Sequence, residues 1–306
     1  MAKRRSRLAV RSALLVGSLL GASGFIGGGT AGATPTPVGL GTATSYGVFA
    51  GGNGASTITN AVSGTHITGD VGLPAPFAKI TGLTCANVTG TIFSTDGAGP
   101  APCSGTDPGT GVENDGRASF NNVSALPGAA TLPADLAGQN LVSGLYSFPA
   151  ASTNLSTTLT LNARGDASSV WIFQASSTLI TSGGSTVQFT NLPSGVTAAQ
   201  LACNVFWTVG SSATISASDA SATFVGTILA SASITVNGPA SGTATMVTGR
   251  LLAANQGSDT GSVTIPGLAT ITTPTGCPVL PAGTGGGPAT TAGPSTPVVS
   301  PPAFTG

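Results

Sequence analysis

The sequence predicts an all-β fold, a β-solenoid of stacked coils with one helix packed alongside. Three observations predict it. Short strand-like segments recur in a fixed order along one stretch of the chain. They mix aliphatic with small hydroxylated residues at the spacing of strands, not of helices. Their period of about 20 to 35 residues is typical of repeat architectures, in which each unit buries its apolar side only by stacking on its neighbours.

Each repeated unit contains three strand-like segments. The opening segments are mainly apolar: VWIF at 170–173, VFWT at 205–208, TILA at 227–230 and RLLA at 250–253. The second segments place one aliphatic residue beside small hydroxylated ones: TLI at 178–180, TIS at 214–216, SIT at 233–235 and SVT at 262–264. Third segments close most units: TVQF at 186–189, TFVG at 223–226 and TMVTG at 245–249. Three short strands per turn make one coil.

The second segments supply the candidate functional surface. We expect their aliphatic residues to point inward on one shared side of the coils, namely Leu179, Ile215, Ile234 and Val263. The flanking hydroxylated residues then point outward, about 4.8 Å apart between coils and about 6.7 Å apart along a strand. The candidates on this flat face are Thr57, Thr59, Thr178, Thr214, Ser216, Ser233, Thr235, Ser262 and Thr264.

Two features weaken this choice of face. Ile180 stands in the outward row in place of a hydroxyl, and threonine and serine are common on exposed strands because of their β-propensity and polarity. The third segments therefore form a rival surface, represented by Thr68, Thr223 and Thr248. We expect the remaining face to be shielded by the helix.

Residues 1–33 have the composition of a secretory signal peptide. A basic start is followed by an apolar stretch at 13–26 and by Ala31-Gly32-Ala33, an A-x-A cleavage signal. Cleavage is expected after Ala33, with general secretion favoured over twin-arginine export because the residues around Arg4 and Arg5 fit that signal loosely. No other run reaches the roughly 18 apolar residues of a membrane span. We expect an extracellular protein without membrane insertion.

Removal of this segment makes the chain acidic. Five of the nine Lys and Arg residues lie within 1–33 and none of the nine acids does, so four bases against nine acids leave a net charge of −5. The remaining bases, Lys79, Arg117, Arg164 and Arg250, are scattered along the sequence. Without a basic patch, neither nucleic acid nor an anionic membrane surface is an expected partner.

The segment from Leu40 to Leu73 repeats the same order of motifs, with YGVFA at 46–50, TIT at 57–59 and ITGD at 67–70. We expect this N-terminal coil to stack with the C-terminal coils. The residues at about 74–127 then form an insertion that includes one helix, at 112–126. Its acids Glu113 and Asp115 suit a helix N-terminus, and Pro127 ends it. Its expected apolar stripe consists of Ala118, Phe120, Val123 and Leu126.

The four cysteines predict disulfides, not a metal site. In an exported protein, Cys85 and Cys103 are close enough in sequence to close a local loop of the insertion. Cys203 and Cys277 could join the third coil to the end of the fold, although other pairings remain open from the sequence. The chain has no C-x-x-C spacing and one histidine, which argues against a metal.

An enzyme is a competing class, because parallel β-helices also carry polysaccharide lyases and hydrolases. Such sites need clustered acids with a base or cation. Here the acids are dispersed, Asp70, Asp166 and Asp219 fall at expected turns, and His66 is expected on an outer face. No G-x-S-x-G motif is present. We therefore expect no enzymatic activity, no cofactor and a monomer.

Residues 278–306 form a Pro/Thr/Gly-rich tail that cannot bury a core and is expected to be disordered or extended. Phe304-Thr305-Gly306 vaguely resembles a wall-sorting signal, but no hydrophobic segment or basic tail follows it. A non-catalytic adhesive protein of the cell surface is the alternative function class.

Several motifs in order resemble the bacterial and fungal ice-binding protein family once listed as the domain of unknown function DUF3494. The resemblance runs from about residue 40 to residue 273. The motifs that carry it are LGTATSYGVFA at 40–50, ITGDVG at 67–72, LVSGLY at 141–146, LTLNARGD at 159–166, VWIFQ at 170–174, NVFWTVG at 204–210 and GTILA at 226–230.

This resemblance implies an irregular right-handed β-solenoid of triangular cross-section over residues 34–277, with the N-terminal coil inserted among the C-terminal ones. It also implies a secreted protein that adsorbs to ice through a flat Thr/Ser-rich face and inhibits ice growth or recrystallisation. Physical chemistry agrees with that expectation. A threonine hydroxyl bonds water while its methyl restrains the water beside it, and a rigid array adds many weak contacts without a new ordering cost.

Overall fold

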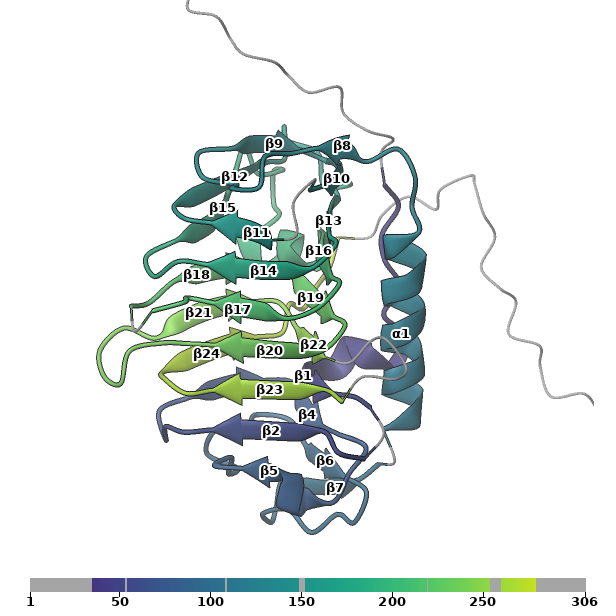
Figure 1. The fold of residues 1–306 in the computed structure, drawn as a ribbon, viewed down its shortest axis with the longest axis vertical. Helices are drawn as coiled ribbons and strands as arrows, with labels where there is room; N and C mark the ends of the chain where they lie inside the picture. Colours follow the sequence, from purple (N-terminus) through teal and green to yellow (C-terminus); the bar gives the residue numbers. More distant parts are fainter. Residues whose placement is uncertain are drawn as a thin grey trace, which may run out of the picture. The chain divides into compact units, whose positions relative to one another are not determined.

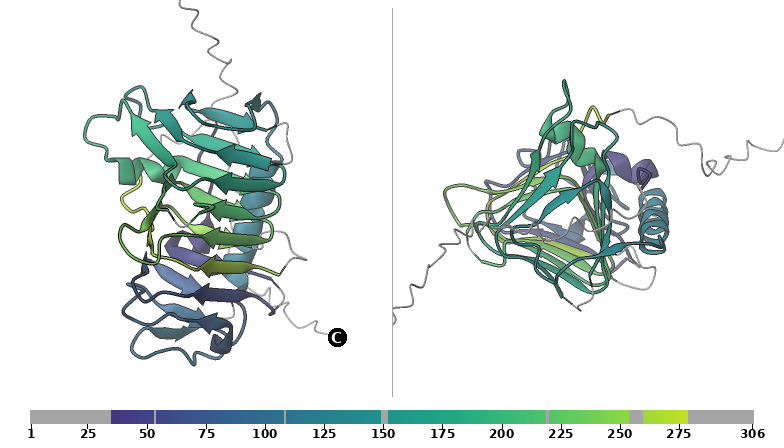
Figure 2. Two further views of the ribbon diagram at one scale, coloured as in Figure 1. Left: turned by 60° about the vertical axis from the view of Figure 1, so that its left-hand side comes forward. Right: turned by 90° about the horizontal axis from the view of Figure 1, so that it is seen from above.

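The computed structural model describes residues 35–52, 54–107, 109–148, 152–218, 220–253 and 260–278. These residues form three parallel sheets that enclose one core, and every strand pairing among them is parallel. Seen along the long axis, the sheets form the sides of a triangle (Figure 2). The coils wind in a right-handed sense (Figure 1). The prediction of a β-solenoid is confirmed.

Each complete coil contributes one strand to each sheet, in the order sheet A, sheet B, sheet C, while the coils at the two ends are incomplete. Sheet A has ten strands: β7 (Ser104–Thr106), β6 (Ile92–Ser94), β4 (Asp70–Gly72), β1 (Tyr46–Ala50), β22 (Leu251–Ala253), β19 (Thr227–Ala230), β16 (Val205–Val209), β13 (Trp171–Ala175), β10 (Gly144–Ser147) and β8 (Ala130–Thr131).

Sheets B and C have seven strands each. Sheet B contains β11 (Ser152–Leu155), β14 (Thr178–Thr181), β17 (Ala213–Ile215), β20 (Ser233–Val236), β23 (Ser262–Ile265), β2 (Thr57–Asn60) and β5 (Ile80–Thr81). Sheet C contains β3 (His66–Thr68), β24 (Ala269–Thr272), β21 (Thr245–Thr248), β18 (Thr223–Val225), β15 (Thr186–Thr190), β12 (Thr158–Asn162) and β9 (Asn140–Val142).

The coils are not stacked in the order of the sequence. The N-terminal coil β1–β3 packs directly on the C-terminal coil β22–β24, through the pairs β1 with β22, β2 with β23 and β3 with β24. From there the chain builds one end of the solenoid with β4–β7. Helix α1 (Thr110–Ser124) then runs back along sheet A, and β8–β24 descend from the other end (Figure 1). The expected stacking of the N-terminal coil on the C-terminal coils is confirmed, but the coil lies between β22–β24 and the β4–β7 end and is not inserted among the C-terminal coils.

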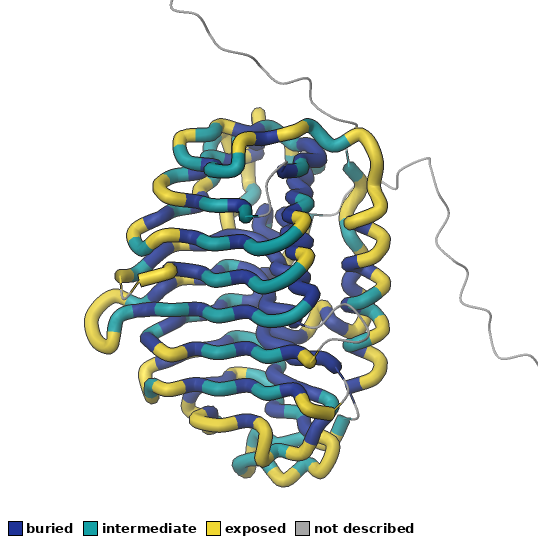
Figure 3. The backbone as a smooth tube through the Cα atoms, viewed as in Figure 1, coloured by how far each residue is buried: buried dark blue, intermediate teal, exposed yellow. Residues whose placement is uncertain are grey.

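The interior is apolar and continuous through all coils. Along the strands of sheet B, residues alternate between buried and half-exposed (Figure 3). Sheet A contributes the largest inward groups, including Phe173 and Trp207, whose rings stack with centroids 3.9 Å apart. The indole N–H groups of Trp171 and Trp207 donate to the carbonyls of Leu141 and Val225, so these buried donors are satisfied.

Helix α1 covers the outer side of sheet A. A second cluster of buried residues joins them, with Val112, Phe120 and Val123 from the helix against Ile172 and Phe206 from the sheet. Sheet A is therefore apolar on both sides, which explains why its segments read as continuous hydrophobic runs. The helix lies two residues earlier than predicted, and Ala118 and Leu126 are exposed, so the predicted stripe was wrong at these two positions. The short helical segments η1 (Gly41–Ser45), η2 (Phe77–Lys79), α2 (Ala198–Leu201) and η3 (Ala202–Asn204) lie in connections.

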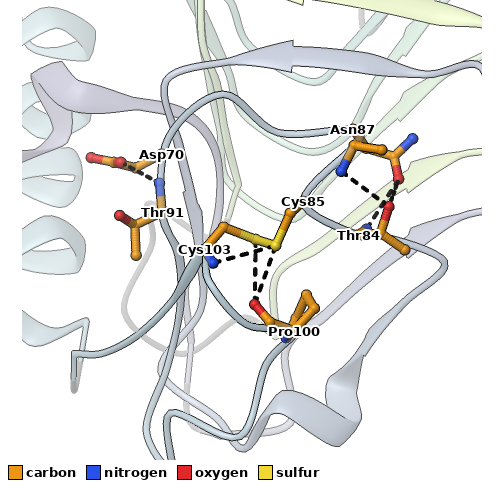
Figure 4. Close-up of a disulfide and its surroundings, with 8 residues drawn as sticks. Asp70, Thr84, Cys85, Asn87, Thr91, Pro100 and Cys103 are labelled. Carbon is orange, nitrogen blue, oxygen red and sulfur yellow. Dashed lines mark hydrogen bonds between the residues drawn. A yellow bond between two sulfur atoms is a disulfide. The ribbon is translucent and has the colours of Figure 1, made fainter.

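Cys85 is bonded to Cys103 as expected, and Cys203 is bonded to Cys277, one of the pairings that the sequence left open. The first lies in the β4–β7 end of the solenoid (Figure 4). The second ties η3 to the last described residues of the chain. No described helix has the length and apolar character needed to cross a membrane. The expected signal peptide and almost all of the expected tail lie outside the described residues.

Candidate functional site

The outer faces of sheets B and C are left open, because α1 covers only sheet A. On sheet B, outward side chains alternate with inward ones in every strand, and the outward ones are half-exposed. The strands β14, β17, β20, β23 and β2 lie side by side as straight, evenly spaced arrows (Figure 1). This regular face is the candidate site.

The strand register aligns five threonines across five consecutive strands. Thr214 pairs with Thr235, Thr235 with Thr264, Thr264 with Thr59, and Thr59 with Thr81. We call this row the threonine ladder; its members are Thr214, Thr235, Thr264, Thr59 and Thr81. The same row continues past Thr214 to Ile180 and Asn154, where it loses its hydroxyls.

A second row, two residues earlier in each strand, is hydroxylated over six strands. We call it the hydroxyl column; its members are Ser152, Thr178, Ser212, Ser233, Ser262 and Thr57. Some of these hydroxyls bond to one another: Thr178 donates to Ser152 over 3.0 Å, and Ser233 donates to Ser212 over 2.8 Å. These bonds between strands restrict the side-chain rotamers and keep the column rigid.

The two rows together form a lattice of small groups. Neighbouring strands are about 4.8 Å apart, and alternate residues of one strand are about 6.7 Å apart. Each threonine presents a methyl and a hydroxyl. The backbone hydrogen bonds between the parallel strands hold both groups in place. Such an array can order a layer of water without losing conformational entropy at the moment of contact.

Eight of the nine predicted residues of this face do point outward on sheet B. Ser216 is the exception: it is fully buried, has a positive φ of 55°, and its hydroxyl donates to the carbonyls of Ser218 and Ala220. Strand β17 ends at Ile215, and Ser216 turns the chain toward sheet C. The prediction for Ser216 was wrong because a simple alternation was extended one residue past the end of the strand.

One of the inward residues also lies in a different row from the one predicted. Leu179 aligns with Ala213 and Ile234, whereas Ile215 aligns with Val236. Ile215 is buried as predicted, but it belongs to a neighbouring inward row. Sequence reasoning also missed Ser152, Ser212 and Thr81. The register Thr59 to Thr81 could have been suspected from the motif IT at 80–81, although two residues are too few to show a period.

The outer face of sheet C is less regular. One of its rows reads Thr158, Thr186, Thr223, Met246, Thr270 and His66. Met246 is 39% exposed and His66 is exposed, so both project from the face. Of the rival residues, Thr68 and Thr248 share another row, and Thr223 is not in it. The hydroxyl of Thr68 accepts a bond from the N–H of Thr273 over 2.8 Å.

Two ionisable side chains outside sheet B, Arg250 and Tyr46, serve the fold. Arg250 is only 3% exposed and donates to the carbonyls of Thr44 and Pro274, and its burial lowers its pKa to about 10. Its side chain thus ties the N-terminal segment to the C-terminal one. Burial, with the nearby Asp107 carboxylate, raises the pKa of Tyr46 far above its ordinary value.

The described residues give no sign of a catalytic centre. A groove of about 910 Å³ at the corner of sheets C and A is lined by Asp70 and Asp107 among others. Both carboxylates are used structurally, since Asp70 accepts from the N–H of Thr91 and Asp107 from Tyr46 and Gly109. No group of three or more His, Cys, Asp or Glu side chains that could hold a metal occurs in the described part of the chain.

Comparison with known proteins gives consistent matches. The family model described as Ice-binding-like matches residues 53–267. A protein of Nostoc sp. (strain HG1) named "Ice-binding protein" is 34% identical over 198 residues, which are 64% of this chain and 63% of that protein. A protein of Flavobacterium frigoris (strain PS1) with the same name is 32% identical over 231 residues, covering 74% of this chain and 75% of that one.

Solved structures agree with the fold. The crystal structure of an ice-binding protein from the Antarctic ascomycete Antarctomyces psychrotrophicus superposes with a TM-score of 0.61 and 32% identity. The match covers 78% of this chain and 98% of that one. The chain therefore shares nearly the whole architecture of that protein, while it spans less than two thirds of the length of the Nostoc relative.

Proposed function

Because the chain belongs to the ice-binding-like family, we propose that it is an ice-binding protein that adsorbs to ice through the outer face of sheet B. The threonine ladder is the observation that carries this assignment. Five threonines in consecutive strands, flanked by the hydroxyl column, offer a flat and rigid array of small side chains on the outer face of sheet B.

The mechanism follows from this geometry. Each threonine contact with water is weak, since a net hydrogen bond contributes about 1 kcal/mol. The ladder and the column are held in place by the sheet, so many such contacts add without a further ordering cost. An adsorbed molecule then blocks the addition of water to the ice beneath it, and we propose inhibition of growth or recrystallisation as the result.

The setting of this function is also proposed. The basic and apolar segment before Ala33 supports export by the general secretory route, with cleavage after Ala33. Two disulfides are consistent with an oxidising compartment. We propose a secreted, non-catalytic monomer that needs no cofactor, with the solenoid as its one folded domain and residues 278–306 as a tail.

The test is ice affinity of the chain from Thr34 onward. A dilute solution is frozen slowly, and the protein concentration in the ice is compared with that in the remaining liquid. We expect enrichment in the ice above an inert globular control of similar mass. Exclusion from the ice at the level of that control would overturn the proposed function and leave an adhesive role to be examined.

A further inference from the structure

The threonine ladder ends in an unusually short strand. Thr81 is its last member and belongs to β5, which has two residues and lies at the edge of sheet B. Only two register pairs hold β5 to the sheet, Ile58 with Ile80 and Thr59 with Thr81. By comparison, β2 and β23 share four pairs. The backbone pairing alone therefore holds Thr81 more weakly than any other member of the threonine ladder.

The chain after Thr81 is anchored by side chains. Gly82, with a φ of 73°, packs against the backbone of Asn60 so closely that a Cβ at this position would collide with it. The Asn60 side chain donates to the carbonyl of Gly82 over 2.8 Å. These contacts fix the direction in which the chain leaves β5, toward the turn at 84–87.

That turn has two further attachments (Figure 4). The Asn87 side chain donates to the carbonyls of Ser63 and Thr65. It also accepts from the N–H of Thr84, as Figure 4 shows. Cys85 is bonded to Cys103, which immediately precedes β7, the edge strand of sheet A. The disulfide thus connects the turn after the edge strand of sheet B to the edge strand of sheet A, across the end of the solenoid.

The end of a solenoid is also where such a connection matters most. A terminal coil has a neighbour on one side only, and its regular structure here consists of strands of two or three residues. Segments with few buried contacts and few strand pairs open at low free-energy cost. A crosslink that closes this coil therefore restricts the motion of the residues just before it.

We infer that the Cys85–Cys103 disulfide is a positioning element of the ice-binding face, which holds Thr81 in register and extends the working ladder from four rungs to five. The inference rests on the proposed function. The other disulfide has no such role, because Cys203 and Cys277 join η3 to the C-terminal segment and neither neighbours a strand of sheet B.

The experiment is a double-mutant cycle of ice adsorption between C85S/C103S and Thr81→Ala. Each change is expected to weaken adsorption about fivefold, the factor that one ordinary hydrogen-bonding contact contributes. The triple variant is expected to be no weaker than either, since the disulfide acts through Thr81. The matched control, C203S/C277S, removes a disulfide but should adsorb as the unmodified protein does. Adsorption of C85S/C103S equal to that of the unmodified protein, or additive losses in the triple variant, would overturn the inference.

Amide hydrogen exchange in the absence of ice separates this inference from the proposed function. In C85S/C103S, the amides of Ile80 and Thr81 should exchange at least tenfold faster, while those of Thr235 and Thr264 keep their protection. Unchanged exchange at Thr81 contradicts the positioning role whether or not the protein binds ice. If the amides of Ile80 and Thr81 exchange faster in C85S/C103S but the unmodified protein is not enriched in ice, the disulfide positions Thr81 and the proposed ice-binding function is wrong.

Discussion

The outer faces of sheets B and C have the same number of strands and a similar supply of threonine, yet they differ in regularity. Sheet B aligns five threonines in consecutive strands, and the hydroxyl column lies beside four of them. Sheet C aligns three, Thr158, Thr186 and Thr223, and then meets Met246. Its pairing of β15 with β18 is a single register pair, whereas β17 and β20 of sheet B share three.

This difference teaches that composition does not make a flat face. Both sheets have threonine because exposed strands favour it. Only sheet B places threonines in the same row over five consecutive strands, so its hydroxyls repeat at a regular spacing over a longer distance. Four experiments test whether this regularity, and not threonine content, decides ice adsorption.

The largest effect is expected from Thr235→Tyr, in the middle of the ladder. A phenol ring projecting from the lattice would separate the flanking threonines from the ice, so adsorption should fall at least tenfold. Because Thr235 is half-exposed, the free energy of unfolding should change by about 0.5 kcal/mol or less. Thr270→Tyr is the matched change on sheet C and should leave adsorption intact. The opposite result for the two variants would move the site to sheet C.

The next effect is a partial gain. Met246→Thr would complete a row of five threonines on sheet C, from Thr158 to Thr270. Introduced into Thr235→Tyr, it should restore a measurable part of the lost adsorption, because the repaired row offers the same number of rungs. Full loss despite the repair would show that the neighbouring column, or the weak pairing of β15 with β18, matters more than one complete row.

A smaller gain is expected from Ile180→Thr. This position continues the ladder beyond Thr214, so the change would lengthen it to six rungs. Adsorption should rise up to about fivefold, since one more hydrogen-bonding contact contributes about 1 kcal/mol. Val142→Thr, also half-exposed but on sheet C, is the control and should change nothing. Weaker adsorption of the Ile180 variant would indicate that an apolar group at this position is favourable to ice contact.

The smallest expected effect is that of pH. The ladder and the hydroxyl column contain no ionisable side chain. Ice adsorption should therefore be constant between about pH 5 and 9, the range in which an unperturbed histidine would change its charge. The groups with shifted pKa values titrate outside this range. The side-chain bond from Ser156 lowers the pKa of Asp135, so its stabilising contribution is lost only as the pH falls through that lowered value. An adsorption that changes across this range would contradict the placement of the site on the threonine ladder and the hydroxyl column.

Alkaline pH has two opposing effects on the free energy of unfolding. Tyr46 has a raised pKa, so it stabilises the fold below its ordinary pKa and loses that contribution as the pH rises. Arg250 has a pKa lowered to about 10 by burial, so its charge is a cost at neutral pH that is relieved above that value. Tyr46 lies in β1 and Arg250 precedes β22, both in sheet A, so we expect ice adsorption to be insensitive to both.

The strands of each coil, the helix and the placement of most threonines on one surface could be predicted from the sequence alone. The recurring apolar and hydroxylated segments predicted the three strands of each coil, because a strand must bury one side and the coils provide that side for one another. The local Cys85–Cys103 pair and the helix also followed from local patterns, whereas the sequence left the pairing of Cys203 with Cys277 open. The sequence placed Thr57, Thr59, Thr214, Thr235 and Thr264 correctly on one surface, since alternation within a strand is a local property.

The tertiary structure alone decided which of these residues stand next to each other. Register between coils depends on how many residues each corner uses, and those corners differ in length, so Ile215 and Ser216 were placed in the wrong rows. The ladder also crosses the junction between Thr264 and Thr59, which are far apart in the sequence and meet only because α1 returns the chain to the far end of the solenoid. A lattice of side chains is a property of packed strands, and no single strand contains it.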